Sequence, residues 1–165
     1  MARANVRPRV TRCKGISSVP VSSTIDVLSL LPHRYPFLLL DRIVEVDPGK
    51  RAVGIKLVTS GEWCSGAPVA GAGAIAMPQT LIVEALAQLT AAILVGLTDS
   101  ASGAVGYFLG IDRVRFRGSA LPGDELLLEV VLRQFRRGVC RTHGVARVGD
   151  RVVVTADLTT VLRAG

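Results

Sequence analysis

The sequence predicts an α+β fold, in which one antiparallel six-stranded sheet wraps around one long central helix. Residues 79–97 are apolar almost all round, which is typical of a buried helix. Two segments rich in β-branched residues precede this helix, and four strand-like segments separated by short turns follow it. One buried helix and one run of antiparallel strands pack as two layers around a shared core.

Before the long helix, the sequence predicts an N-terminal segment, a short helix, two strands and a loop. Residues 1–22 are basic and then rich in Ser, Val and Pro, so we expect a flexible N-terminal segment followed by a single domain over 23–165. Thr24 is placed to cap a short helix that Pro32 ends. The elements expected here are, in order, a helix over 25–31, strands over 37–46 and 51–59, and a glycine-containing loop over 60–76.

Turn residues divide the part of the chain after the long helix. The sequences PGD, RRG and GD separate apolar, alternating segments and are typical of tight connections. Short connections join antiparallel neighbours, so the last three segments should form a meander. The strands expected here cover 105–116, 125–135, 138–148 and 151–162.

Composition narrows the class of protein. The chain has 165 residues, which suits one domain, and only 4% aromatic residues, which argues against stacking of single-stranded nucleic acid. Much of the net charge of +7 comes from residues 1–14, which hold five basic residues and no acid. Such a tail could contact nucleic acid or a membrane surface, but we interpret it as a solvated arm.

Cysteine usage and hydropathy bear on the compartment. The three cysteines are widely spaced and include no CxxC pair, which argues for a reducing compartment and against a disulfide framework or a zinc site. Glu84 interrupts the best apolar run, so no membrane span is expected. We therefore expect a cytoplasmic protein with no metal and no cofactor.

Glu84 is the most informative single residue, because it lies in the most apolar helix of the chain. A carboxylate in apolar surroundings should be partnered, neutral or directed into a cavity, and such a group suits general acid–base chemistry. The alternative is that Glu84 shares an exposed stripe with Gln88, four residues later. The helix alone does not choose between the two.

Three motifs resemble those of the β-hydroxyacyl-acyl-carrier-protein dehydratase family of the FabZ type. They are residues 31–42 (LPHRYPFLLLDR), residues 77–88 (MPQTLIVEALAQ), and residues 107–117 with 122–124 (YFLGIDRVRFR and PGD). The resemblance runs from about residue 25 to the C-terminus. It implies a hot-dog fold, a homodimer or larger assembly, and an acyl-carrier-protein or acyl-CoA thioester bound in a tunnel at the dimer interface.

The resemblance also implies the site residues. Glu84 matches the family's catalytic carboxylate. The positions expected to contact substrate are Gly73, Met77, Pro78, Gln79, Thr80, Gln88, Tyr107 and Phe108.

The chain departs from the family pattern in the loop before the helix. Counting back from Glu84 places Ala70 where the family has its catalytic histidine, and Gln79 replaces a family glycine. The two histidines of the chain, His33 and His143, are expected to be structural or surface residues. Dehydration needs both a base and an acid, so loss of the loop histidine should slow it by several orders of magnitude.

Arginines gather in the strands after the helix. Arg113, Arg115 and Arg117 alternate along one predicted strand, and Arg133, Arg136 and Arg137 follow one strand later. We expect a basic patch formed by Arg113, Arg115, Arg117, Arg136 and Arg137 to steer an acidic carrier protein. A solvated strand face is an equally good interpretation, and no motif supports a nucleic-acid partner.

Three functional hypotheses follow. The first is a dehydratase-family protein that binds acyl thioesters but dehydrates them poorly. The second is a hot-dog thioesterase that uses Glu84 as base or nucleophile. The third is a partner subunit of a heteromeric dehydratase, in which a second chain supplies the histidine.

Overall fold

The structure is a computed structural model that describes residues 25–61, 75–94 and 105–163. Within these residues the helices are α1 (Val27–Leu30) and α2 (Gln79–Leu94). The strands are β1 (Arg42–Asp47), β2 (Arg51–Leu57), β3 (Val105–Phe116), β4 (Glu125–Arg136), β5 (Val139–Val148) and β6 (Arg151–Arg163).

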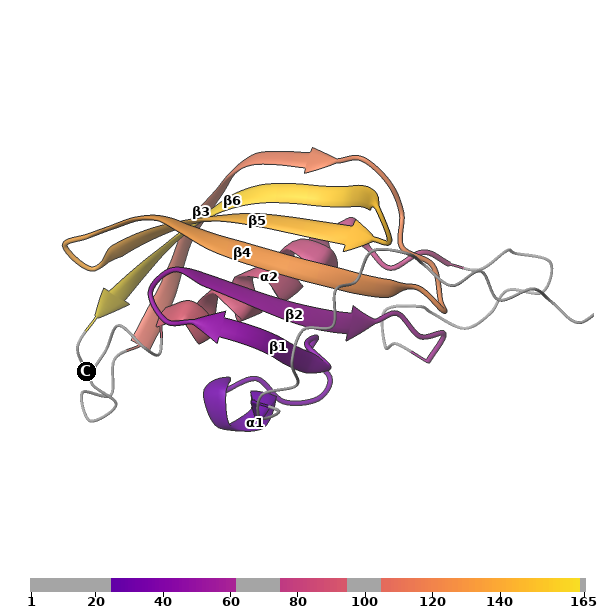
Figure 1. Cartoon of the computed structure of the whole chain (residues 1–165), viewed down its shortest axis with the longest axis horizontal. Coiled ribbons are helices and arrows are strands. Elements are labelled where there is room, and N and C mark those ends of the chain that lie inside the picture. The colour runs from indigo at the N-terminus through magenta and orange to yellow at the C-terminus, as the bar shows by residue number, and fades with distance from the viewer. Residues whose placement is uncertain (1–24, 62–74, 95–104, 164–165) are drawn as a thin grey trace, which may run out of the picture.

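The six strands form one antiparallel sheet in the order β1-β2-β4-β5-β6-β3. The sheet curves over α2, which lies along its inner face (Figure 1). The strands β4, β5 and β6 are consecutive neighbours, so the predicted meander is confirmed. The predicted α+β class, with six antiparallel strands around a long helix, is also confirmed.

The packing between α2 and the sheet makes the core. Leu86, Leu89 and Ile93 of α2 are fully buried. The helix approaches β5 so closely that a Cβ atom on Gly144 would lie 3.1 Å from a methyl carbon of Leu86. A methyl group at this crossing would therefore require the Leu86 side chain to move away. The same face holds one buried hydroxyl pair, Thr90 and Thr142, whose Oγ1 atoms are 3.2 Å apart.

The region before β1 corrects two sequence predictions. The short helix begins after Asp26, whose carboxylate accepts a hydrogen bond from the Leu28 amide at 3.0 Å, whereas Thr24 lies outside the described residues. The first strand begins at Arg42 and not at residue 37. The apolar run before it is core packing, because Leu39 and Leu40 are buried against α2 and the sheet in a non-strand connection.

The start of α2 is fixed by the connection between β3 and β4. The Pro78 carbonyl accepts hydrogen bonds from the Leu81 and Ile82 amides, so the helix opens at the predicted place. The Met77 amide donates to the Ala120 carbonyl at 2.9 Å. Described α2 ends at Leu94, and the predicted extension to residue 97 lies outside the described residues.

No helix in the described part of the chain is long and apolar enough to cross a membrane.

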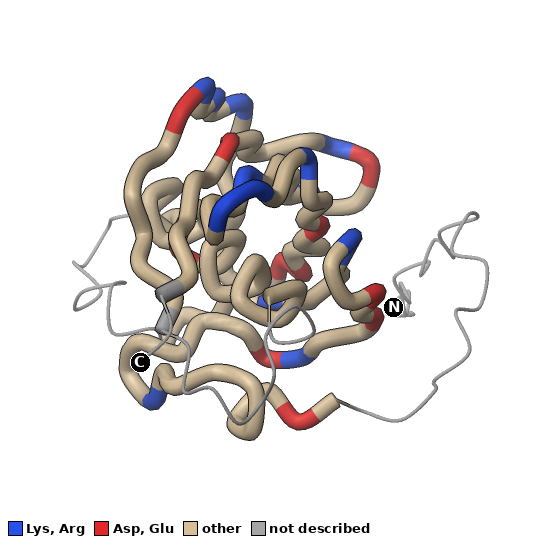
Figure 2. Tube along the Cα trace, turned by 90° about the vertical axis from the view of Figure 1, so that its left-hand side faces the viewer, with Lys and Arg blue, Asp and Glu red and all other residues tan. Residues whose placement is uncertain are grey.

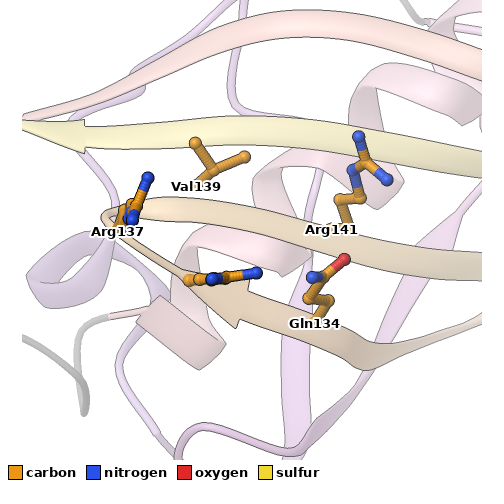
Figure 3. Close-up of a pocket in the computed structure, with 5 residues that line it drawn as sticks. Gln134, Arg137, Val139 and Arg141 are labelled. Atoms are coloured by element: carbon orange, nitrogen blue, oxygen red, sulfur yellow. The ribbon is translucent and has the colours of Figure 1, made fainter.

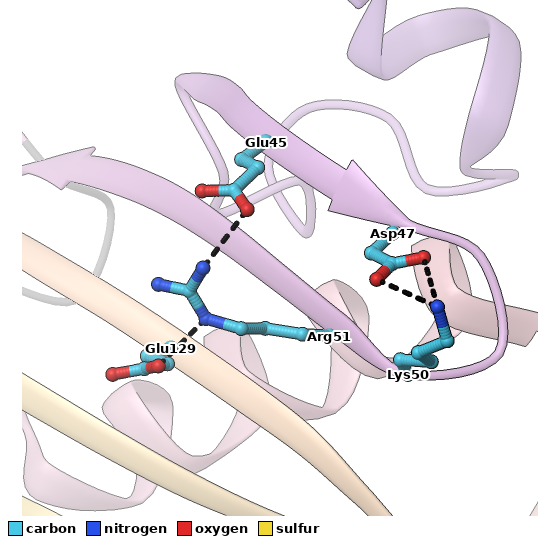
Figure 4. A network of polar contacts seen from close by, with 5 residues as sticks. All are labelled: Glu45, Asp47, Lys50, Arg51 and Glu129. Atoms are coloured by element: carbon cyan, nitrogen blue, oxygen red, sulfur yellow. Dashed lines mark hydrogen bonds and ion pairs between the residues drawn. The ribbon is translucent and has the colours of Figure 1, made fainter. Parts of the chain in front are cut away.

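Ion pairs tie the strands together near the β1–β2 turn. Arg51 Nε lies 2.8 Å from Glu129 Oε1, and Arg51 Nη1 lies 2.9 Å from Glu45 Oε1 (Figure 4). The hydrogen bond with Glu129 raises the pKa of Arg51. Lys50 and Asp47 form a second pair within the turn, at 3.2 Å. Arg51 thereby links β1, β2 and β4, although exposed pairs of this kind are worth about 1 kcal/mol or less.

Candidate active site beside the central helix

Glu84 lies in the second turn of α2 and faces a pocket, although its immediate neighbours Val83 and Ala85 are buried. Its side chain is 46% exposed, so the carboxylate is not sealed in the core. The pocket has a volume of about 210 Å³. Its lining residues are Thr80, Val83, Glu84 and Ala87 from α2, and Phe108, Ile111, Val114 and Phe116 from β3. Helix and strand thus place one carboxylate against a largely apolar wall.

Gln88 holds Glu84 from the next turn of the helix. Its Nε2 donates to Glu84 Oε1 at 3.0 Å and to the Phe37 carbonyl at 2.7 Å. Its Oε1 accepts a hydrogen bond from the Leu39 amide at 3.0 Å. The Gln88 side chain is almost fully buried, and its bond to the Leu39 amide lies within the core. The exposed stripe considered for Glu84 and Gln88 is therefore wrong for Gln88.

His33 approaches the carboxylate from the connection between α1 and β1. Its Nε2 lies 3.8 Å from Glu84 Oε1. Next to it, the Arg34 guanidinium donates to the carbonyls of Leu31, His33 and Leu28 at 2.7, 2.8 and 3.2 Å, which fixes this turn. The imidazole side chain is 35% exposed, while its Nδ1 is buried and has no hydrogen-bond partner among the described residues.

Five of the residues expected to contact substrate divide into three groups. Thr80 and Phe108 line the pocket with Glu84. Met77 is buried in the core, and the Gln79 side chain donates to the Gly118 carbonyl at 2.6 Å. Tyr107 is exposed on β3 and does not line the pocket.

Two of the expected site residues cannot be placed. Ala70, at the position of the family's histidine, and Gly73 both lie outside the described residues.

Sequence reasoning missed five of the lining residues. On the helix, Val83 and Ala87 follow Thr80 at spacings of three and seven, which is the period that puts residues on one helix face. That signal was available in the sequence. On β3, Ile111, Val114 and Phe116 do not follow simple alternation, because the pairing with β6 shifts register between Asp112 and Arg115. Only the folded strand reveals them.

The strand that forms one wall of the pocket is also an edge of the sheet. Among the described strands, β3 pairs only with β6. Its exposed large hydrophobic residues are Tyr107, Phe108, Leu109, Ile111 and Phe116. An uncovered edge with this much apolar surface is typical of a place where another chain packs.

The predicted basic patch falls on two places in the structure. Arg113, Arg115 and Arg117 are exposed, but the register shift in β3 interrupts the alternation that was expected to align them. The hairpin between β4 and β5 carries Arg136 and Arg137 and projects on the left of Figure 1, which is the side that faces the viewer in Figure 2. A pocket of about 350 Å³ at this hairpin is lined by Gln134, Arg136, Arg137, Val139 and Arg141 (Figure 3).

The second histidine belongs to a different cluster. His143 Nδ1 lies 2.5 Å from Asp157 Oδ1, and Arg113 Nε donates to Asp157 Oδ2 at 2.6 Å. Burial raises the pKa of Asp157, but the hydrogen bonds from His143 and Arg113 outweigh it and hold this pKa below its ordinary value. Among the described residues, no group of three or more His, Cys, Asp or Glu side chains could hold a metal ion.

A curved antiparallel sheet around a helix that carries one carboxylate defines a protein of the hot-dog fold. Two solved structures share this fold at low sequence identity. The dehydratase heterocomplex ApeI:P from Xenorhabdus doucetiae has a TM-score of 0.67 and 21% identity, with 83% of this chain and 90% of that chain covered. A hypothetical thioesterase protein from Streptococcus pneumoniae, solved with coenzyme A, has a TM-score of 0.58 and 14% identity, with 74% and 85% covered.

The family follows from sequence. Residues 31–157 match the FabA-like domain. The 3-hydroxyacyl-[acyl-carrier-protein] dehydratase FabZ of Caldanaerobacter subterraneus is 47% identical over 142 residues, which is 83% of this chain and 95% of the relative. The FabZ of a Roseiflexus species is 46% identical over 138 residues, or 81% and 91%. The chain therefore belongs to the FabA-like family and is FabZ-like within it, as the three motifs predicted.

Proposed function

We propose that this protein binds 3-hydroxyacyl thioesters of acyl carrier protein in the pocket beside Glu84 and dehydrates them more slowly than its relatives. The observation that carries the proposal is a half-exposed carboxylate, fixed by Gln88, at the side of an apolar pocket. The apolar wall suits an acyl chain, and the carboxylate suits proton exchange at the carbons next to the thioester.

The reduced rate follows from the sequence of the loop before α2. Residues 62–74 contain no histidine, although the resemblance places the family's base there. One carboxylate cannot readily remove the C2 proton and also protonate the departing hydroxyl. The loss of one acid–base group commonly costs a factor of about 10²–10⁴.

A second copy of the chain would complete the pocket. The strand β3 provides four of the eight lining residues and is an edge whose apolar side chains are exposed. Pairing of two β3 edges would satisfy their backbone groups and cover this surface. We therefore propose a homodimer, or a larger assembly built from such dimers, as the functional form.

The test compares wild type with Glu84→Gln on 3-hydroxyacyl thioesters of acyl carrier protein of several chain lengths, with enoyl product measured by mass spectrometry. Glu129→Gln is the matched control, because Glu129 lies in the Arg51 ion pair on β4 and does not line the pocket. We expect slow turnover in wild type and in the control, and none in Glu84→Gln. If wild type neither binds nor converts any of these thioesters, the proposal is wrong.

The basic pocket at the β4–β5 hairpin supports a docking place for the carrier protein, which is acidic. Arg136, Arg137 and Arg141 provide three guanidinium groups within one pocket. Replacing Arg136 and Arg137 together by Glu should lower kcat/KM for thioesters of the carrier protein and leave kcat/KM for the matching coenzyme A thioesters nearly unchanged. An equal loss for both substrates would argue against docking at this hairpin.

Thioester hydrolysis is the second candidate, because one positioned carboxylate can act as base for water without a second group. Release of free thiol from a panel of acyl-CoAs, abolished in Glu84→Gln, would favour this activity over dehydration.

A heteromeric dehydratase is the third candidate function. A partner chain that co-purifies and supplies a histidine would restore a fast rate to the mixture. If no partner co-purifies, the heteromer is excluded.

A further inference from the structure

The whole chain contains two histidines, His33 and His143. Any histidine that works with Glu84 in an assembly of identical chains must therefore be one of these two. The position of each histidine relative to Glu84 therefore decides whether it can take part in the chemistry of the site.

His143 faces away from the helix that carries Glu84. Its neighbours on β5 point inward, since Thr142 contacts Thr90 of α2 and Gly144 packs against Leu86. Successive residues of a strand point to opposite faces, so His143 lies on the outer face of the sheet. There its ring is engaged by Asp157.

His33 is on the same side of the sheet as Glu84 and is held there by two sets of contacts. The Arg34 guanidinium binds three carbonyls of its own turn, which limits the freedom of the residues around His33. A few residues later, Gln88 binds both Phe37 and Leu39, which anchors the connection to α2 one helical turn from Glu84. The result is a separation of 3.8 Å between His33 Nε2 and Glu84 Oε1.

The two ring nitrogens of His33 are not equivalent. Nδ1 is buried, so Nε2 is the nitrogen that faces the carboxylate. The imidazole and the carboxylate are both partly exposed, at 35% and 46%, so a ligand can reach them. A separation of 3.8 Å is longer than a strong hydrogen bond, which leaves both groups free to exchange protons with a third molecule.

We propose that His33 is the second catalytic residue of this protein and forms a histidine–glutamate pair with Glu84 in one chain. The inference rests on the proposed function, and His33 would restore part of the rate that the missing loop histidine costs. The acyl tail would lie in the pocket between α2 and β3, and carbons 2 and 3 at its mouth between the two side chains.

The dehydration step balances with these two groups and no other reactant. His33 Nε2 takes a proton from C2, and the electron pair of that C–H bond forms the double bond between C2 and C3. The C3–O bond breaks, and the hydroxyl leaves as water with the proton of the Glu84 carboxyl group. Proton transfer from His33 Nε2 to Glu84 then restores the starting pair.

The test uses the full chain as His33→Asn, with His143→Asn as the matched control. We expect His33→Asn to lower kcat for a 3-hydroxyacyl thioester by about 10²–10⁴-fold, with little change in KM, and added imidazole to restore part of the rate. The exchange of C2 protons in deuterium oxide should fall in parallel. His143→Asn should match wild type in all three measurements.

A second measurement does not depend on the folding of a variant. Diethyl pyrocarbonate modifies exposed imidazoles, and peptide mass mapping distinguishes the two histidines of wild type. Modification of His33 should abolish turnover and C2 exchange, and a saturated acyl-CoA should protect against it.

The outcomes separate this inference from the proposed function. If Glu84→Gln abolishes turnover while His33→Asn retains the wild-type rate, the role of His33 is wrong and the proposed function stands. If wild type binds acyl thioesters but shows neither turnover nor C2 exchange, the histidine–glutamate pair is again excluded. If Glu84→Gln is as active as wild type, both proposals fall.

Discussion

Gln88 and Glu84 are joined by a hydrogen bond of 3.0 Å across one turn of α2, and the same amide group of Gln88 also binds the chain at Phe37. One buried side chain therefore couples the candidate catalytic carboxylate to the connection that carries His33. Stability and activity should respond together when this side chain is changed.

Gln88→Leu should lower the free energy of unfolding by about 1–3 kcal/mol, because it removes the acceptor of the buried Leu39 amide. Turnover should fall as well, since Glu84 loses its only hydrogen-bond donor within the described residues. Urea unfolding and enzyme assays check the two effects. Gln134→Leu, at an exposed position of β4, is the control for stability, and its free energy of unfolding should be nearly unchanged. A neutral Gln88→Leu would contradict the coupling.

The hydroxyl pair of Thr90 and Thr142 should show strong non-additivity. The Thr90 hydroxyl donates to the Leu86 carbonyl, so the Thr142 hydroxyl donates to Thr90. Thr90→Val should cost about 1 kcal/mol, because it leaves the buried Thr142 hydroxyl without its acceptor. Thr142→Val should cost less, because the Thr90 hydroxyl keeps its bond to the Leu86 carbonyl. The double variant should cost less than the sum of the two. Simple additivity in a denaturation cycle would mean that the two hydroxyls do not interact.

Gly144→Ala should destabilise the fold by about 1–3 kcal/mol, since the added methyl group would meet the Leu86 side chain at 3.1–3.3 Å at the tightest crossing of α2 and β5. Gly61→Ala is the control, because nothing lies within 4 Å of an added Cβ atom there. Thermal unfolding of both variants measures the difference. Equal melting temperatures would show that the helix can move away from the sheet without cost.

The Asp157 cluster should give a pH-dependent contribution to stability. Burial raises the pKa of Asp157, but the hydrogen bonds with His143 and Arg113 lower it by more than burial raises it. The pKa of Asp157 in the folded state therefore lies below its pKa in the unfolded state. A depressed pKa means stabilisation that is present above the unfolded value, about pH 4, and lost as the pH falls through the folded value. The stability gap between wild type and Asp157→Asn should therefore be largest above about pH 5 and should close on acidification. A gap that grows as the pH falls would contradict this sign.

Much of the fold could be predicted from the sequence because its signals are local. The apolar tract of α2, the alternation along β4 to β6 and the glycine-containing turns each depend on neighbouring residues, and their bounds agree with the structure to within a few residues. The first strand was predicted too long, since Leu39 and Leu40 are apolar for core packing and not for strand pairing. A local pattern does not distinguish these two reasons for burial.

The sequence by itself determined the fold class and the family and indicated Glu84 as the candidate catalytic residue, because periodicity and motif order are properties of the chain as written. Only the tertiary structure decided which residues surround Glu84. His33 meets this carboxylate from a segment about fifty positions away, and the register shift in β3 selects which of its side chains line the pocket. Such meetings depend on how the helix lies against the sheet and its connections, and no spacing along the chain encodes them.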